Sequence, residues 1–195
     1  MKEEISEAIV LRSLPFKERE RLLTLFSQKQ GLLSLIIKKI SSSSLNLFTL
    51  SSPFCCAEYH FSKRNSDIFS FIDATVCDEH LFLREKYSHL ETASAFAEAI
   101  LSSQLPHKST PALYALLKQF LRQIPHFEDP RPLIASFYLK VLKHEGIINI
   151  QELPLPQELA KNLLEARQFS SLKEIQLSTA LLSTLKKKFL DLVKA

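Results

Sequence analysis

The residues of this chain that could carry out chemistry do not fall into the spacings of the common catalytic motifs. Glycine occurs only at Gly31 and Gly146, whereas an average chain of this length would contain about 14 glycines. Dinucleotide-binding fingerprints and phosphate-binding loops need several closely spaced glycines, and a nucleophile elbow needs the pattern GxSxG. These enzyme classes are therefore excluded, and we expect a protein that is not an enzyme and uses no cofactor.

Metal-binding spacings are missing as well. The six histidines form no HExxH pattern. We interpret His126, in the segment PHFEDPRP, as part of a loop whose acids start a helix. Cys55 and Cys56 are adjacent and Cys77 stands alone, so a zinc site of the CxxC type is excluded. Because neighbouring residues of a strand face opposite sides, we expect one of Cys55 and Cys56 in the core and the other at the surface.

Alternating charge marks the segment from Lys17 to Arg21, which reads KERER. In a helix, Lys17 and Arg21 would form a like-charged pair four residues apart, which is mildly destabilising. In an extended chain, alternate residues point to opposite sides. Lys17, Arg19 and Arg21 would then form a basic edge with two carboxylates behind it. The alternative is a solvated hairpin with no binding role.

The elements that would position this edge are predicted to be strands. Residues of the first part of the chain repeat their apolar character with a period of two, which is typical of half-buried strands. Five such strands indicate a small barrel, and the run Ser41–Ser44 is predicted to be a loop. Scarce glycine counts against a tightly bent barrel, whose corners often use it. The predicted strands cover residues 5–14, 20–28, 32–39, 53–63 and 67–76.

Basic residues outnumber acids locally in this first half, since seven lysines and arginines between residues 12 and 39 face only Glu18 and Glu20. A basic cluster on a small five-stranded barrel indicates sequence-independent binding of nucleic acid, because OB-folds use strands 2 and 3 and adjacent loops for it. Base stacking would need exposed aromatics, for which Phe16, Phe26 and Tyr59 are candidates. An aromatic at strand spacing is more often a core residue, so only cations are predicted contacts. These are Lys17, Arg19, Arg21, Lys38, Lys39, Lys63 and Arg64.

From about Cys77 onward the apolar period becomes helical. Ser88 and Glu91 are spaced as a capping box, and Gly146 can end the helix RPLIASFYLKVLKH. We therefore predict an α+β chain, with a five-stranded barrel domain at 1–78, which the resemblance given below implies is an OB-fold, and a helical domain at 79–195. Lys186, Lys187 and Lys188 could form a second basic patch or simply a solvated helix face. Helices are predicted near residues 88–101, 111–124, 131–144, 157–167 and 177–193.

The cytoplasm is the expected location. The longest apolar runs, such as residues 32–37, are far shorter than the roughly 20 residues that span a bilayer. The N-terminal sequence MKEEISEA carries acids where a secretory signal would need a basic region. We expect no membrane contact.

Two segments resemble a known family. In AIVLRSLPFKERERLLTLFSQKQGLLSLIIKK, the resemblance rests on Glu18 after Phe16, the strand Leu-Thr-Leu-Phe-Ser, Gly31 in the following turn and, further on, Pro53-Phe54. In FYLKVLKHEGI, residues 137–147, the spacing from phenylalanine through leucine to glycine is similar. Together these segments resemble the RecO family of bacterial DNA repair and recombination mediators.

This resemblance implies an N-terminal OB-fold, a helical domain and a set of activities. Members bind single- and double-stranded DNA, anneal complementary strands, contact RecR and the tail of single-strand-binding protein, and help to load RecA. None of these activities is catalytic. The alternative is a protein-interaction adaptor of the recombination machinery with little DNA affinity.

The chain departs from the family pattern at three places. A basic loop after the third strand is replaced by Lys39-Ile40 and the serines Ser41–Ser44. A four-cysteine zinc module that many relatives carry after the Gly146 helix is absent, so no zinc is expected. Relatives often have an arginine just before Phe137, whereas here the nearest upstream arginine is Arg131, which would weaken or move binding of the acidic partner tail.

Overall fold

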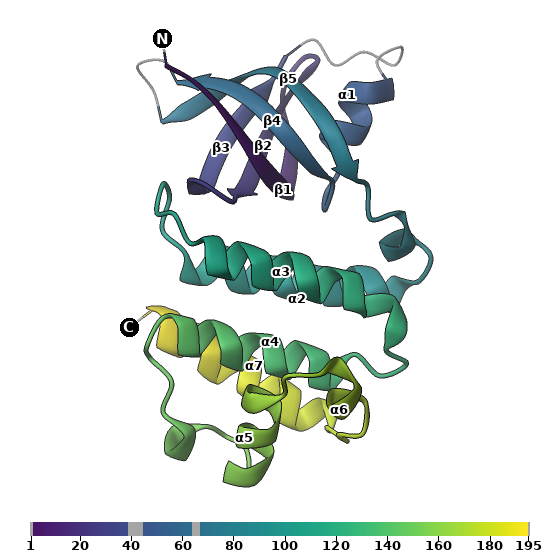
Figure 1. The fold of residues 1–195 in the computed structure, drawn as a ribbon, viewed down its shortest axis with the longest axis vertical. Coiled ribbons are helices and arrows are strands. Elements are labelled where there is room, and N and C mark those ends of the chain that lie inside the picture. The colour runs from purple at the N-terminus through teal and green to yellow at the C-terminus, as the bar shows by residue number, and fades with distance from the viewer. Residues whose placement is uncertain (1, 39–44, 64–66, 195) are drawn as a thin grey trace. The chain divides into compact units, whose positions relative to one another are not determined.

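A computed structural model of the chain describes residues 2–38, 45–63 and 67–194 (Figure 1). The backbone divides into two compact units, of which the first is Met1–Leu81 with Gln104–Ala115. The second is Phe82–Ser103 with Leu116–Ala195. The segment 104–115 groups with the strands although helices precede and follow it, so the division into 1–78 and 79–195 remains a prediction.

Five strands close into a barrel in the order β1-β2-β3-β5-β4. All neighbouring pairs are antiparallel except β3 and β5, which are parallel. The predicted α+β class with an N-terminal five-stranded OB-fold barrel is confirmed. The strands are β1 Lys2–Lys17, β2 Glu20–Ser27, β3 Gly31–Ile37, β4 Cys56–Lys63 and β5 Ile68–Asp78.

Alternate residues of the strands fill the barrel interior. Leu23 and Leu25 of β2 point into the core, together with Leu33, Leu35 and Ile37 of β3, as the period of two requires. A short helix, α1 (Leu45–Leu50), adds Leu50 to this core. This helix was not predicted, because its six residues are too few to reveal a helical period.

Tyr59 is the largest polar side chain inside the barrel. Its hydroxyl donates a hydrogen bond to the Leu50 carbonyl at 2.7 Å, so the buried phenol is satisfied and fastens α1 to the strands. Burial raises the pKa of Tyr59 well above its ordinary value, and the thiols of Cys55, Cys56 and Cys77 raise it further.

Strand β1 closes the barrel by pairing with two neighbours. Its first half, Lys2 to Ile9, lies opposite β4, and its second half, from Ala8, lies opposite β2. The register with β2 shifts between Val10 and Arg12 and again between Pro15 and Lys17. Such bulges bend and twist a strand locally, which supplies curvature without glycine.

The segment Gln104–Ala115 covers part of the outer surface of the barrel. Pro106 forms an isolated bridge with Leu32 at the start of β3, and the His107 N–H donates to the Leu32 carbonyl at 2.9 Å. The ring of Tyr114 lies 5.9 Å from that of Phe26 on β2. The last residues of this segment begin helix α3, so a helical period does not reveal that they belong with the strands.

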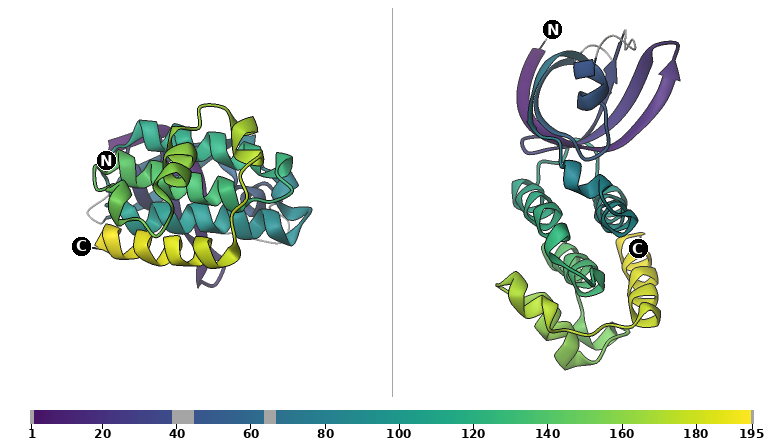
Figure 2. Two further views of the ribbon diagram at one scale, coloured as in Figure 1. Left: turned by 90° about the horizontal axis from the view of Figure 1, so that it is seen from below. Right: turned by 90° about the vertical axis from the view of Figure 1, so that its right-hand side faces the viewer.

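The second unit is a helical bundle arranged around α4. Phe137 of α4 contacts Phe96 at a centroid distance of 4.5 Å and Phe120 at 5.3 Å. Tyr138 stacks on Phe189 at 4.8 Å, and Figure 2 shows the yellow helix α7 running alongside α2 and α4. The helices are α2 Tyr87–Ser103, α3 Pro111–Gln123, α4 Arg131–His144, α5 Gln157–Glu165, α6 Phe169–Lys173 and α7 Thr179–Lys194.

One of the two predicted helix caps is present. Gly146 has a φ of +74°, its N–H donates to the Lys143 carbonyl at 3.1 Å, and the Ile147 N–H donates to the Leu142 carbonyl at 3.1 Å. This is the Schellman arrangement, so the predicted C-terminal cap is confirmed. The predicted capping box at Ser88 is wrong, because α2 already begins at Tyr87 and Ser88 lies within its first turn.

The expectation for the paired cysteines is also wrong. Cys55 and Cys56 are both buried, and Cys77 is exposed. Cys56 lies outside the barrel core cluster, but its Sγ atom lies 3.7 Å from the hydroxyl of Tyr114, so the covering segment shields it from solvent.

Neither membrane spans nor metal clusters occur in the part of the chain that the structure describes. Over residues 2–38, 45–63 and 67–194, no helix has the length and apolar character needed to cross a bilayer. Within the same ranges, no three His, Cys, Asp or Glu side chains are placed so that they could hold a metal ion.

Candidate nucleic-acid interface

The charged segment KERER forms the tip of the β1–β2 hairpin. Lys17 lies opposite Glu20, so the connection consists of Glu18 and Arg19 alone. Arg19 has a φ of +61°, an uncommon conformation for a residue with a side chain and one that reverses the chain tightly. The segment is therefore the predicted connection between the first two strands.

The prediction that Lys17, Arg19 and Arg21 share one face is wrong. Arg21 lies opposite Pro15 and alternates with Leu23, so it points to the core side of the sheet. Lys17 lies opposite Glu20 on the other side. The turn at Arg19 interrupts the alternation that an extended strand would keep, and this separates the cations.

Arg21 is held by contacts inside the first unit. Its Nη1 donates a hydrogen bond to Ser13 Oγ at 3.1 Å. The centre of its guanidinium lies 5.5 Å from the centroid of the Phe48 ring on α1. The side chain is half-buried, so these contacts restrict how far Arg21 can reach towards a ligand.

Lys17, Arg19 and Lys38 lie at the end of the β1–β2–β3 sheet that carries the β1–β2 turn. Ile37 lies opposite Arg21, so Lys38, the next residue, comes beside Glu20, which in turn faces Lys17. All three cations are exposed. Exposed lysine and arginine side chains can neutralise phosphates and release the counterions bound to them.

Lys63 lies elsewhere on the barrel. It is the last residue of β4, opposite Lys2 of β1, and β4 is bonded to β1 and β5. Its Nζ atom lies 3.9 Å from Asp67 Oδ1 and 5.5 Å from the centroid of the Phe69 ring. The two other predicted contacts, Lys39 and Arg64, fall outside the described residues, as do the serines Ser41–Ser44.

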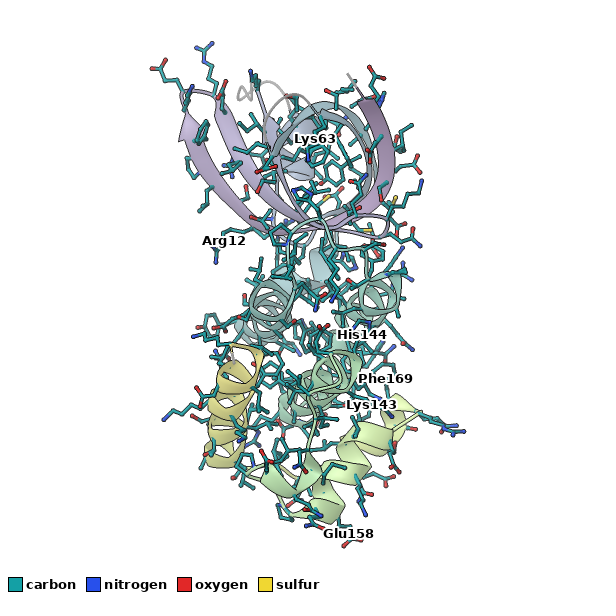
Figure 3. The ribbon with its side chains drawn as sticks, turned by 90° about the vertical axis from the view of Figure 1, so that its left-hand side faces the viewer. Arg12, Lys63, Lys143, His144, Glu158 and Phe169 are labelled. Carbon is teal, nitrogen blue, oxygen red and sulfur yellow. The ribbon has the colours of Figure 1, made fainter. Side chains whose placement is uncertain are left out.

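Arg12 was counted in the basic cluster but not among the predicted contacts. It lies opposite Thr24 on β2, is exposed, and points away from the barrel in Figure 3. Simple alternation along β1 misplaces it, because the register shift between Val10 and Arg12 changes which residues face outward.

Of the three candidate stacking aromatics, two are buried and one is exposed. Phe26 and Tyr59 are completely buried, in line with the expectation that aromatics at strand spacing belong to the core. Phe16 is 46% exposed, and Lys17 Nζ lies 5.6 Å from its ring centroid. Phe48 of α1, 57% exposed, was not identified, since its short helix was not predicted.

The helical unit also contains basic groups beside a cavity of about 640 Å³. Lys140 Nζ donates to the carbonyls of Leu164 at 3.0 Å and Ala166 at 3.2 Å. Burial lowers the pKa of Lys140, and the neighbouring charge of Lys143 lowers it further. Figure 3 labels Lys143 and Phe169, which both line this cavity.

The lysine run in α7 is largely paired. Lys186 Nζ lies 2.7 Å from Glu98 Oε2, and Lys188 Nζ lies 3.8 Å from Glu152 Oε2. The carboxylates compensate these charges, which favours a solvated helix face over a second binding patch.

Comparison with known proteins places the barrel in a family. Residues 1–79 match the family model described as Recombination protein O N terminal. A protein of Chlamydia pneumoniae named DNA repair protein RecO is 27% identical over 142 residues, which are 73% of this chain and 56% of that relative. The protein of the same name from Clostridium kluyveri is 28% identical over 142 residues, 72% of this chain and 55% of the relative.

A third relative, DNA repair protein RecO of Chlamydia trachomatis serovar D, is 26% identical over 142 residues, 73% of this chain and 58% of the relative. The chain thus spans little more than half the length of the relatives it matches. The matched N-terminal domain, the closed five-stranded barrel and these relatives agree with the resemblance in the sequence. These matches support the RecO family for this chain.

Proposed function

We propose that this chain is a DNA repair and homologous recombination mediator. It binds single- and double-stranded DNA, anneals complementary strands and helps, together with RecR, to load RecA on DNA coated by single-strand-binding protein. The observation that carries the proposal is the exposed group Lys17, Arg19 and Lys38 at the end of the β1–β2–β3 sheet. The name DNA repair protein RecO of the relatives supports it.

The chemistry of this role is electrostatic and involves no covalent step. Phosphates bound by the cations lose part of their mutual repulsion, which favours the approach of a second strand and therefore annealing. Because phosphates carry no sequence information, the binding is the same for all sequences. Arg21, Lys39, Lys63 and Arg64 remain predicted contacts, of which the first is turned towards the core side of its strand.

A fluorescence titration with a labelled single-stranded oligonucleotide tests the proposal. The chain is expected to bind at low salt, to lose affinity steeply as salt rises, and to bind regardless of sequence. Repeating the titration with RecR tests the partner contact, which should raise the amount of protein retained on the DNA. Failure to bind any oligonucleotide at low salt would contradict the mediator role.

An interaction adaptor with little DNA affinity is the second candidate. The cavity whose lining includes Lys140, Lys143 and Phe169 supports it, because cations beside an aromatic ring suit an acidic peptide with apolar residues. The tail of single-strand-binding protein is the acidic partner that the family resemblance implies. An adaptor would bind a peptide of that tail, lose the binding in Lys143→Gln, and show no salt-dependent binding of oligonucleotide.

A further inference from the structure

A bulge near the end of β5 brings two cysteines together. Cys56 of β4 lies opposite Asp78 of β5, and the next pair along the ladder is Ala57 with Val76. Strand β5 therefore has one extra residue, Cys77, between the two pairs. A bulge of this kind sets two residues of one strand against a single residue of the other, so Cys77 and Asp78 share Cys56 as their partner.

The side chains of Cys56 and Cys77 lie on the same, outer side of the barrel wall. Ala57 belongs to the barrel core, and Val76 packs against that core. Consecutive residues of a strand point to opposite faces, so Cys56, just before Ala57, and Cys77, just after Val76, both point outward. Cys55 is a member of the core cluster and lies on the inner side.

The separation of Cys56 and Cys77 suits a disulfide. Residues opposite each other in an antiparallel pair have Cα atoms about 4.5–5.5 Å apart, and Cys77 is one residue away from the position opposite Cys56. Since one residue advances a strand by about 3.4 Å, the two Cα atoms lie about 6 Å apart. Disulfides join Cα atoms separated by about 4.4–6.8 Å, whereas all three cysteines are reduced in this structure.

The two thiols differ in their access to solvent. Cys77 is exposed, and its Sγ atom lies 3.8 Å from the Thr75 carbonyl oxygen. Cys56 is completely buried, and its Sγ atom lies 3.7 Å from the Tyr114 hydroxyl. Sulfur is a weak donor and acceptor, so little is lost when the two sulfurs turn towards each other. An oxidant in solution reaches Cys77 first.

We propose that Cys56 and Cys77 form a redox-active thiol pair that small disulfides such as oxidised glutathione convert to an intramolecular disulfide. The Cys77 thiolate attacks one sulfur of oxidised glutathione, the bond between the glutathione sulfurs breaks, and one reduced glutathione leaves. The Cys56 thiolate then attacks the Cys77 sulfur, and the second reduced glutathione leaves. Two electrons pass from the cysteines to the glutathione disulfide, and the two thiol protons end on the released glutathiones.

The disulfide changes how the segment Gln104–Ala115 is attached to the barrel. Once its sulfur is bonded to Cys77, Cys56 no longer contacts the Tyr114 hydroxyl, which keeps its 2.9 Å hydrogen bond to Glu7. The segment therefore loses one of its contacts with the strands and opens more often. This thiol pair does not depend on the DNA contact proposed above.

The test counts thiols after oxidation of the folded chain. Wild type, Cys55→Ala, Cys56→Ala and Cys77→Ala are incubated with oxidised glutathione at low protein concentration, quenched with acid, unfolded and titrated with a thiol reagent. Mass spectrometry records any bound glutathione, and circular dichroism confirms that each variant is folded. Cys55→Ala is the matched control, because it removes the adjacent thiol on the core side. Cys77→Ala changes an exposed position and keeps the test valid if a buried variant does not fold.

The wild type should fall from three thiols to one, without bound glutathione, and regain all three with dithiothreitol. Cys55→Ala should lose both of its thiols, Cys77→Ala should keep both, and Cys56→Ala should retain glutathione on Cys77. Three remaining thiols in the wild type, glutathione retained on it, a disulfide that still forms in Cys77→Ala, or a disulfide between two chains would each overturn the inference.

Hydrogen exchange of the oxidised wild type tests the effect on the segment Gln104–Ala115. Its amides, including the His107 N–H that donates to the Leu32 carbonyl, should exchange faster in the oxidised than in the reduced chain. Oxidised Cys77→Ala is the control and should exchange as its reduced form does. Equal exchange in the two forms of the wild type would overturn the proposed release of the segment.

Discussion

The hydroxyl of Tyr114 donates a 2.9 Å hydrogen bond to Glu7 Oε1, joining two residues that are 107 positions apart in the chain. Its ring packs beside Phe26, and Cys56 Sγ lies 3.7 Å from its oxygen. Burial raises the pKa of Tyr114 far above its ordinary value, and Cys56 and Glu7 raise it further. Tyr114 therefore remains a neutral donor throughout the physiological range and ties the segment Gln104–Ala115 to the barrel.

Tyr114→Phe should destabilise the protein by about 1–2 kcal/mol, because a hydrogen bond to a carboxylate is lost while the ring is kept. The measurement is urea unfolding followed by circular dichroism. Tyr87→Phe is the matched control, since Tyr87 is 81% exposed and the same change should leave the unfolding midpoint in place. Equal midpoints for the two variants would show that the hydrogen bond contributes nothing to stability.

Gly31 and Gly146 allow the destabilisation caused by adding a side chain to be compared at two positions of similar backbone conformation. Both have positive φ, +67° and +74°, so alanine is strained at either position by about 1 kcal/mol. A Cβ atom at Gly31 would in addition collide with the backbone carbonyl of Lys108, whereas none of the described atoms lies within 4 Å of one at Gly146. Gly31→Ala should therefore lower the free energy of unfolding by at least about 1 kcal/mol more than Gly146→Ala does. Urea unfolding of the two variants measures the difference. If their unfolding curves coincide, the clash at Gly31 does not occur.

Asp129 makes stability depend on pH. Its Oδ1 accepts hydrogen bonds from the Arg131 backbone N–H at 3.0 Å and from Nε at 2.8 Å, just before α4. Burial acts to raise the pKa of Asp129, but these hydrogen bonds and the charge of Arg131 outweigh it, so the pKa lies below its usual range. Because the pKa of Asp129 is lower in the folded than in the unfolded state, its ionised form stabilises the fold at pH values above the unfolded-state pKa. This stabilisation is lost as the pH falls through the folded-state pKa.

Asp129→Asn should accordingly be less stable than the wild type at neutral pH, by roughly 0.5–1 kcal/mol. The difference should shrink as the pH falls below about 4. Urea unfolding at several pH values measures it, with Asp191→Asn on the exposed side of α7 as control. A difference that is the same at every pH would mean that the charge of Asp129 is not responsible.

Much of the fold could be predicted from the sequence, because the core residues of β2 and β3, Leu23, Leu25, Leu33, Leu35 and Ile37, recur with a period of two. The apolar residues of α4 recur with a helical period. Which residues of β1 face outward could not be predicted. Its bulges at Val10–Arg12 and Pro15–Lys17 change which side of the sheet the following residues face, and no glycine marks these bulges. The outward position of Arg12 follows from the first of these bulges.

The candidate site was predicted in part for a similar reason. Lys17, Arg19 and Lys38 are brought together, but Arg21 is turned towards the core side by the two-residue turn at Arg19. The segment Gln104–Ala115 could not be assigned to the barrel, because its place depends on tertiary contacts such as Tyr114 with Glu7. Likewise, only the burial of the completed fold distinguishes Phe16, which is exposed, from Phe26, which is not.

The most direct test of the proposed DNA contact is the salt dependence of oligonucleotide binding in the variant Lys17→Gln/Arg19→Gln. Glutamine removes each charge and keeps a side chain, so the strain of positive φ at Arg19 is unchanged. Lys161→Gln, an exposed position of α5, is the control. If both cations contact phosphates, the double variant should bind all single strands more weakly, and the slope of log affinity against log salt should fall by about 1.4. A slope equal to that of the wild type and of Lys161→Gln would contradict the assignment of the binding face to this end of the barrel.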